Sequence, residues 1–307
     1  MQIRFVNFWK TFNENDNFFK KYLDYFGYNP KLVQDKKSAV DLEIHSVFYT
    51  KSLRKLIGLD KKLKSRSYLN SKRIQKMSEF AISQKTVAAK RIWFTGENIR
   101  PPYDQLFDRY LSFDQFNFND NNFYFPLWYT HLDWFGVPEF NSRVGIHVSM
   151  SNLVEKRKLT QAKKKFACIF LSNPHPFRLE MVKKLRENFE VDVFGSYSGN
   201  PVTHKLDVSK DYMYTICFEN DFYPGYVTEK ILEAYISETV PIYWGDFGND
   251  ISFNPDSFLN LSSFENFADL VEKIKSCDYE KIYEQPLLNH KVDFTLFHDF
   301  MSKFLKQ

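Results

Sequence analysis

Short apolar runs separated by amphipathic stretches dominate the first half of the chain. The runs have the length of strands, and the segment Phe18–Phe26 places its apolar residues at helical spacing. The strands expected in this half are Ile3–Phe8, Val40–Phe48, Arg91–Thr95, Tyr110–Phe113 and Phe123–Tyr129, the last interrupted by Pro126. Strands that alternate with helices predict an α/β layer with a largely parallel sheet.

The second half shows the same alternation after a polar, charged run from Glu155 to Lys165, which we interpret as a linker. Strands are expected at Phe166–Leu171, Val191–Phe194, Tyr212–Phe218, Val240–Trp244 and Phe258–Leu261, and helices at Pro176–Asn188, Asn266–Ile274 and about Asp293–Leu305. The pattern therefore predicts one α/β domain over residues 1–160, a second over residues 161–290 and a terminal amphipathic helix over residues 291–307.

The most informative segment is Phe218–Gly245, which reads FENDFYPGYVTEKILEAYISETVPIYWG. It predicts a strand end, a loop punctuated by Pro224–Gly225, a helix that begins there, and a second buried strand. Such crossover units bind ligands where the loop meets the helix N-terminus, because free N–H groups and the helix dipole attract anions. Lys230, expected in the first helical turn, opposes that dipole and so indicates an anionic ligand. The polar residues on or beside the loop are Asn220, Tyr226, Glu229 and Lys230, and a phosphorylated ligand is expected.

Composition adds a globular class and an uneven charge. The 307 residues suit two domains, and an aromatic content of 18% supplies apolar surface for two cores. The net charge of +4 decides little, but the stretch Lys51–Arg91 is strongly basic, and its only acidic residues are Asp60 and Glu79. This stretch is either a solvated helical face or a patch for anionic lipid or nucleic acid. Three cysteines without a CxxC pair are typical of a reducing compartment.

Several familiar sites have no signature in the chain. There is no DxD motif, and the histidines show no paired ligand spacing, so no metal site is predicted. There is also no GxxxxGK[ST] or GxGxxG motif, which leaves ATPase and dinucleotide-binding functions without their usual support. No apolar segment is long enough to span a membrane, and the first residues lack a signal-peptide pattern.

The elements FEN, GYVTEKI and VPIYWG within Phe218–Gly245 are similar to the signature of the α1,3/α1,4-fucosyltransferase family, glycosyltransferase family 10, and resemble its bacterial branch. The resemblance implies an α/β fold of two Rossmann-like domains facing across a cleft, the GT-B architecture. It assigns the acceptor to the first domain and a GDP-sugar donor to the second. Animal members have a membrane anchor, and its absence here favours a cytoplasmic enzyme, peripheral on the inner face of the membrane.

The resemblance also implies roles for residues of the second domain. Lys230 and Arg178 match positions that the family uses for the donor diphosphate, and the planar fork of Arg178 suits bidentate phosphate contact. Asn220 and Tyr226 match donor-binding positions. Glu229 either stabilises the developing positive charge on the sugar or holds the donor ribose. A surface ion pair is the alternative for Lys230 and for Arg178, and Glu219 is either a strand-end carboxylate facing a basic neighbour or part of the donor site.

A catalytic base is expected in the first domain. WFTGEN places Glu97 directly after an apolar strand, at the edge where α/β domains carry their active sites. The segment Thr95–Asn98 with Pro101 resembles the family segment that carries the proposed general base, and a turn carboxylate is the alternative for Glu97. Asp104, Asp108 and Asp114, just downstream, are interpreted as structural.

The expected function is an inverting transfer of L-fucose from GDP-fucose to the 3-hydroxyl, or the 4-hydroxyl, of N-acetylglucosamine in a lactosamine-type glycan, as in Lewis-type surface polysaccharide synthesis. The acceptor is an oligosaccharide or a lipid-linked glycan, and a basic patch against anionic lipid fits the latter. No tightly bound cofactor and no strict metal requirement are expected. The alternatives are the same fold with another nucleotide-sugar donor or another acceptor and, more remotely, a nucleic-acid-binding protein that uses the Lys51–Arg91 patch; the leading interpretation has no nucleic-acid partner.

Overall fold

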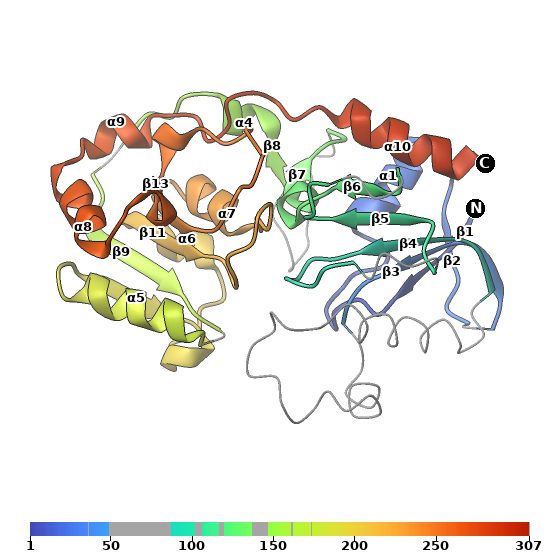
Figure 1. The fold of residues 1–307 in the computed structure, drawn as a ribbon, viewed down its shortest axis with the longest axis horizontal. Coiled ribbons are helices and arrows are strands. Elements are labelled where there is room, and N and C mark those ends of the chain that lie inside the picture. Colours follow the sequence, from blue (N-terminus) through green and yellow to red (C-terminus); the bar gives the residue numbers. More distant parts are fainter. Residues whose placement is uncertain are drawn as a thin grey trace. The chain divides into compact units, whose positions relative to one another are not determined.

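The computed structural model describes residues 1–35, 37–48, 87–101, 106–116, 120–136, 147–160, 162–172 and 174–306. Two compact units divide the chain: unit 1 comprises Met1–His147 and Phe294–Gln307, and unit 2 comprises Val148–Asp293. Each unit is an α/β layer around its own sheet (Figure 1). The domain boundaries predicted from the sequence, at residues 160 and 290, stay predictions.

Unit 1 is built on a six-stranded sheet in the order β2-β1-β3-β4-β5-β6, in which adjacent strands are parallel. The strands are β1 (Gln2–Val6), β2 (Lys31–Leu32), β3 (Ala39–His45), β4 (Val87–Phe94), β5 (Arg109–Ser112) and β6 (Asn122–Tyr124). The run Phe123–Tyr129, expected to be interrupted at Pro126, is a strand only as far as Tyr124, because Pro126 occupies the N-cap position of the 3-10 helix Leu127–His131. The parallel sheet expected from the alternation is confirmed.

Two helices cover one side of this sheet (Figure 1). Aromatic side chains form the contact. Helix α1 (Phe18–Tyr25) begins where the Asn17 side chain accepts a hydrogen bond from Lys20 N. The terminal helix α10 (Phe294–Lys306) places the Phe297 ring 5.5 Å from that of Phe18 and 4.9 Å from that of Phe125. The last helix of the chain therefore completes the core of the first unit.

A buried ionic cluster lies inside the same sheet. Glu43, with no exposed surface, accepts from Arg4 Nη1 at 2.7 Å and lies 3.1 Å from His45 Nε2. Burial lowers the pKa of His45, although Glu43 opposes the shift. Burial opposes ionisation of Glu43, but His45 and Arg4 outweigh it, so the pKa of Glu43 also lies below its usual range.

The cluster predicts that unit 1 loses stability in mild acid. Unfolded His45 takes up a proton below pH about 6.5, whereas the folded residue stays neutral, so the free energy of unfolding falls as the pH drops through this value, by up to about 1.4 kcal/mol per pH unit. Glu43 contributes in the same direction at lower pH. Urea unfolding at pH 7.5 and 5.5 should show a smaller pH effect in His45→Gln than in the wild type. The exposed His290 provides the control His290→Gln, and an undiminished pH effect in His45→Gln would contradict the prediction.

Unit 2 has a five-stranded parallel sheet in the order β10-β9-β11-β12-β13. Its strands are β9 (Lys165–Phe170), β10 (Val191–Phe194), β11 (Tyr212–Phe218), β12 (Val240–Trp244) and β13 (Leu259–Asn260). Its helices are α4 (Met150–Val154), α5 (Pro176–Arg186), α6 (Lys205–Ser209), α7 (Lys230–Ile236), α8 (Phe267–Ser276) and α9 (Tyr279–Tyr283). Two further short strands lie outside the two large sheets: β7 (Leu132–Asp133) in unit 1 and β8 (Val148–Ser149) in unit 2. The expected α/β fold with two mostly parallel sheets is confirmed.

The polar run Glu155–Lys165, interpreted above as a linker, is anchored in unit 2 by Arg157. Its guanidinium donates to the carbonyl oxygens of Tyr283 at 3.0 Å, Tyr235 at 2.6 Å and Thr239 at 3.2 Å. The same group lies 3.7 Å from the ring centroid of Tyr235 and 4.2 Å from that of Tyr283. Polarity alone indicates a linker, whereas one arginine ties this segment to α7 and α9.

Replacing Arg157 with alanine is expected to lower the free energy of unfolding by about 3–5 kcal/mol, because three carbonyl acceptors lose a charged donor and two rings lose their contact. Arg157→Lys should recover little, since one ammonium cannot replace the planar fork. Urea unfolding measures both variants. The exposed neighbour Lys156 provides the control Lys156→Ala, expected within about 0.5 kcal/mol of the wild type. An Arg157→Ala protein as stable as that control would contradict the role of Arg157 as an anchor.

Candidate active site

The predicted residues of the second domain gather at one edge of the unit 2 sheet. Because β9, β11 and β12 are parallel, the segments that follow them leave at the same edge. Arg178 comes from α5, after β9, and its Nη1 donates to Oδ1 of Asn220, in the loop after β11, at 3.1 Å. Lys230 begins α7 after the same loop. The structure thus brings together two cations that are far apart in sequence.

Glu219 joins this group and is completely buried. Its Oε2 accepts from Lys230 Nζ at 2.9 Å, and its Oε1 accepts from Thr228 N at 2.8 Å. Lys230 Nζ also donates to Thr228 Oγ1 at 2.8 Å, and the Tyr243 hydroxyl donates to Glu219 Oε1 at 3.3 Å. The carboxylate therefore forms the centre of a hydrogen-bonded cluster that spans the loop before α7 and the strand β12.

The charges in the cluster influence one another. Burial lowers the pKa of Lys230, but the nearby carboxylates of Glu219 and Glu229 outweigh it, and the net shift is upward. Burial lowers the pKa of Arg178, and Glu219 opposes that shift. Lys230, whose side chain is 20% exposed, thus stays cationic while it reaches the surface.

The helix of the motif begins later than the sequence predicts. Helix α7 starts at Lys230, not at Pro224–Gly225, and Gly225 has a φ of 82°. Pro224 forms a parallel bridge with Asp246, and Gly225 N donates to Asp246 O at 2.8 Å. Val227, expected on the helix, is buried in the loop. The amide of Thr228 is used by Glu219 and is not available to a ligand. The anion site expected where the loop meets the helix N-terminus stays a prediction, now for a helix that begins at Lys230.

Tyr226 and Glu229 flank Thr228 in this loop. Tyr226 is 2% exposed, and Glu229 is partly exposed and occupies the N-cap position of α7. Both belong to the same short segment as Lys230, so every predicted donor residue lies in unit 2 at or next to the cluster around Glu219.

Glu97 lies in unit 1, just beyond the end of β4. Thr95 Oγ1 accepts from Glu97 N at 3.2 Å and donates to Glu97 O at 2.7 Å, which holds the backbone in a tight turn. The Glu97 side chain is partly exposed at the carboxyl end of the strand. Asp114, by contrast, is 1% exposed and forms an ion pair with Arg100 at 3.1 Å, in line with its interpretation as structural; Asp104 lies outside the described residues.

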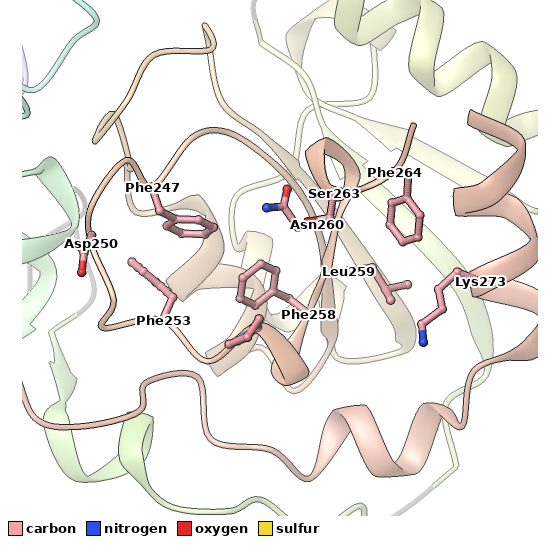
Figure 2. Close-up of a pocket in the computed structure, with 10 residues that line it drawn as sticks. Phe247, Asp250, Phe253, Phe258, Leu259, Asn260, Ser263, Phe264 and Lys273 are labelled. Carbon is pink, nitrogen blue, oxygen red and sulfur yellow. The ribbon is translucent and has the colours of Figure 1, made fainter. Parts of the chain in front are cut away.

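Unit 2 also contains a cavity of about 290 Å³ (Figure 2). Phe247, Phe253 and Phe258 gather on one side of it, and Leu259, Phe264 and Lys273 on the other (Figure 2). Phe253 and Phe258 are buried, and the Phe247 ring lies 4.6 Å from that of Phe253. The predicted site residues do not line this cavity.

The remaining expectations fall partly outside the described residues. Most of the basic stretch Lys51–Arg91 lies there. Within the described part, no group of three or more His, Cys, Asp or Glu side chains could hold a metal ion. Among the described helices, none has both the length and the apolarity needed to cross a membrane. Cys168 and Cys217 are buried free thiols.

The sequence did not single out Thr228, Tyr243 and Gly245, and it left Glu219 open between two roles. One local signal could have pointed to this cluster: Glu219 lies at the end of a strand, and Thr228, Glu229 and Lys230 follow it at the end of the next loop. Pairing across that loop could not be inferred from spacing, because it depends on where α7 begins.

Comparison with known proteins agrees with this architecture. Crystal structures of an α1,3-fucosyltransferase, one with GDP and one with GDP-fucose, match with TM-scores of 0.67 and 0.65 and identities of 25% and 23%. Each match covers 100% of this chain and 90% of the other. The two α/β units thus have the fold of GT-B glycosyltransferases.

Sequence similarity narrows the class. Residues 160–291 match the C-terminal region of glycosyltransferase family 10 (fucosyltransferase). The chain is 32% identical to alpha-(1,3)-fucosyltransferase FucT of Helicobacter pylori over 228 residues, which cover 65% of this chain and 48% of that protein. It is 26% identical to 4-galactosyl-N-acetylglucosaminide 3-alpha-L-fucosyltransferase 9 of Bos taurus over 44% of this chain and 39% of that protein. The chain spans about half the length of these curated relatives, or less, and its similarity to glycosyltransferase family 10 covers residues 160–291.

Proposed function

We propose that the protein is an inverting α1,3-fucosyltransferase that uses GDP-fucose as donor. The observation that carries the proposal is the pair of cations, Arg178 and Lys230, held at the carboxyl edge of the unit 2 sheet in a region that matches family 10. A nucleoside diphosphate leaving group carries negative charge that grows as the sugar bond breaks, and fixed cations stabilise it. Asn220 and Tyr226 complete the donor site in this proposal.

The proposed reaction is a single displacement. Glu97 removes the proton from the acceptor hydroxyl, the hydroxyl oxygen bonds to the anomeric carbon of fucose, and the bond to GDP breaks on the opposite face. One displacement inverts the anomeric configuration. Glu229 either stabilises the positive charge that develops on the sugar or holds the donor ribose. The variant Glu229→Gln separates these roles. A loss of kcat alone indicates the first role, and weaker GDP binding indicates the second.

We assign the acceptor to the lactosamine class, with the 3-hydroxyl of N-acetylglucosamine as the attacking group and the 4-hydroxyl as the alternative. The name of the Bos taurus relative supports galactosyl-N-acetylglucosamine, and Lewis-type surface glycan synthesis is the corresponding process. A lipid-linked acceptor and a cytoplasmic position at an anionic membrane surface form part of this proposal and rest on the basic stretch Lys51–Arg91. Since two side-chain cations face the diphosphate, activity should persist in a chelator.

GDP release with GDP-fucose and N-acetyllactosamine, with and without EDTA, tests the proposal, and calorimetry measures GDP binding separately. Turnover that requires both substrates supports it. A protein that binds GDP-fucose but does not turn over has another acceptor. A protein that prefers another nucleotide sugar keeps the fold but not the donor, and one that binds no nucleotide sugar at all contradicts the proposal.

A further inference from the structure

We infer that Glu219 is a positioning residue: held by Thr228 and Tyr243, it fixes the ammonium group of Lys230 toward the leaving diphosphate. The inference rests on the proposed function and adds to it three residues that the sequence did not assign. It concerns how the cation is held, because Glu219 itself is fully buried and out of reach of a ligand.

The first argument is the number of hydrogen-bond donors on Lys230 and the acceptors that they use. Its ammonium has three donors, of which one goes to Glu219 Oε2 at 2.9 Å and one to Thr228 Oγ1 at 2.8 Å. Among the described residues, the third donor has no protein acceptor. Two fixed bonds determine where the third N–H points, and the partly exposed side chain leaves it accessible. A flexible lysine thereby becomes a directed donor for one oxygen of a ligand.

The second argument is that consecutive residues hold the two cations. Glu219 bonds Lys230 of α7, and Asn220 accepts from Nη1 of Arg178 in α5 at 3.1 Å. The two partners are 11 and 42 residues away in the sequence, so the loop after β11 is the place where both are aligned. A single ion pair for stability would not require this arrangement, since a buried pair is often no more stable than apolar residues of the same volume.

The third argument is the closed space around the carboxylate. A Cβ atom added at Gly245 would lie 2.9 Å from Glu219 Cγ and within clash distance of the Tyr243 hydroxyl. The Tyr243 hydroxyl is itself bonded to Glu219 Oε1 at 3.3 Å. Because glycine has no Cβ atom, Tyr243 and Glu219 can contact each other at this position. The Thr228 hydroxyl also donates to Glu219 Oε2, at 2.8 Å, so four donors from three residues fix the position of the buried carboxylate.

The test compares Glu219→Gln with the wild type, with Lys230→Ala and with the double variant, measuring the Kd for GDP and the kcat of fucose transfer. Glu219→Gln should weaken GDP binding about ten- to hundredfold, because the amide presents N–H groups to the ammonium. If Glu219 acts through Lys230, the double variant should bind GDP as Lys230→Ala does, with no added loss. Glu219→Asp, which keeps the charge, should recover part of the affinity.

Glu233→Gln is the matched control, because Glu233 lies on the same helix and pairs with Lys205 at 2.7 Å without contacting Lys230. It should bind GDP within about twofold of the wild type. Additive losses in the double variant, or wild-type affinity in Glu219→Gln, would overturn the inference while leaving the proposed function intact. A wild-type protein that binds no GDP would instead overturn the proposed function, and this inference with it. Should Glu219→Gln fail to fold, Tyr243→Phe and Thr228→Val test the same coupling, with GDP affinity unchanged in both as the contradicting result.

Discussion

Replacing Glu97 with glutamine is expected to lower kcat for fucose transfer about 10²–10⁴-fold, with the Kd for GDP nearly unchanged. The amide keeps the size of the side chain but cannot accept a proton from the acceptor hydroxyl. The turn that presents it should persist, because it is held by backbone and Thr95 hydroxyl contacts that the substitution leaves in place. Steady-state kinetics and calorimetry with GDP measure the two quantities.

A control for Glu97 is Asp24→Asn, since Asp24 is an exposed carboxylate of the same unit that pairs with Lys20 at 2.6 Å. Its kcat should equal that of the wild type. Equal kcat in Glu97→Gln and Asp24→Asn would refute Glu97 as the base and favour its alternative as a turn carboxylate. A parallel loss of GDP binding in Glu97→Gln would instead indicate general damage to the protein.

Arg178→Lys is the second substitution with a large expected effect. It should raise the Kd for GDP about ten- to hundredfold, because one ammonium replaces a planar fork that bonds Asn220 through Nη1. Arg178 is 5% exposed, so its position is set by packing and a shorter-reaching group cannot follow the ligand. Calorimetry with GDP, alongside urea unfolding, separates binding from stability.

The exposed residue Lys183 on the same helix provides the comparison for Arg178, and Lys183→Ala should bind GDP as the wild type does. If Arg178→Lys binds GDP equally well and turns over normally, the guanidinium serves the fold and not the donor. A loss of affinity accompanied by an equal loss of stability would assign the effect to folding.

The order of strands and helices could be predicted because it depends on local periodicity. Apolar runs marked β9, β10, β11 and β12 to within a few residues, and the helical spacing of Phe18–Phe26 marked α1. The beginning of α7 could not be predicted, since apolar residues continue at helical spacing back to Val227, while the backbone just before it, at Pro224 and Gly225, pairs with Asp246. The helix can begin only after this pairing ends, and the pairing depends on Asp246, which lies beyond β12 and distant in the sequence.

The sequence likewise predicted chemical roles only for single residues and not for pairs of residues. The types and spacing in FEN and GYVTEKI indicated an anionic ligand and a resemblance to a family, and that resemblance is confirmed over residues 160–291. Their partners were not readable: Lys230 was weighed as a phosphate contact against an ion pair, and it does form an ion pair, with Glu219. The polar run at Glu155–Lys165 gave no sign that Arg157 is inserted between two tyrosines.

The sequence by itself therefore determined the α/β class, the approximate elements and the resemblance to the fucosyltransferase family, because each depends on neighbours along the chain. Only the tertiary structure decided that Glu219 holds Lys230, that Asn220 holds Arg178, and that α10 packs with α1 of the first unit. These pairings join residues distant in the sequence. They follow from which strands lie side by side and which groups must find hydrogen-bond partners once water is excluded.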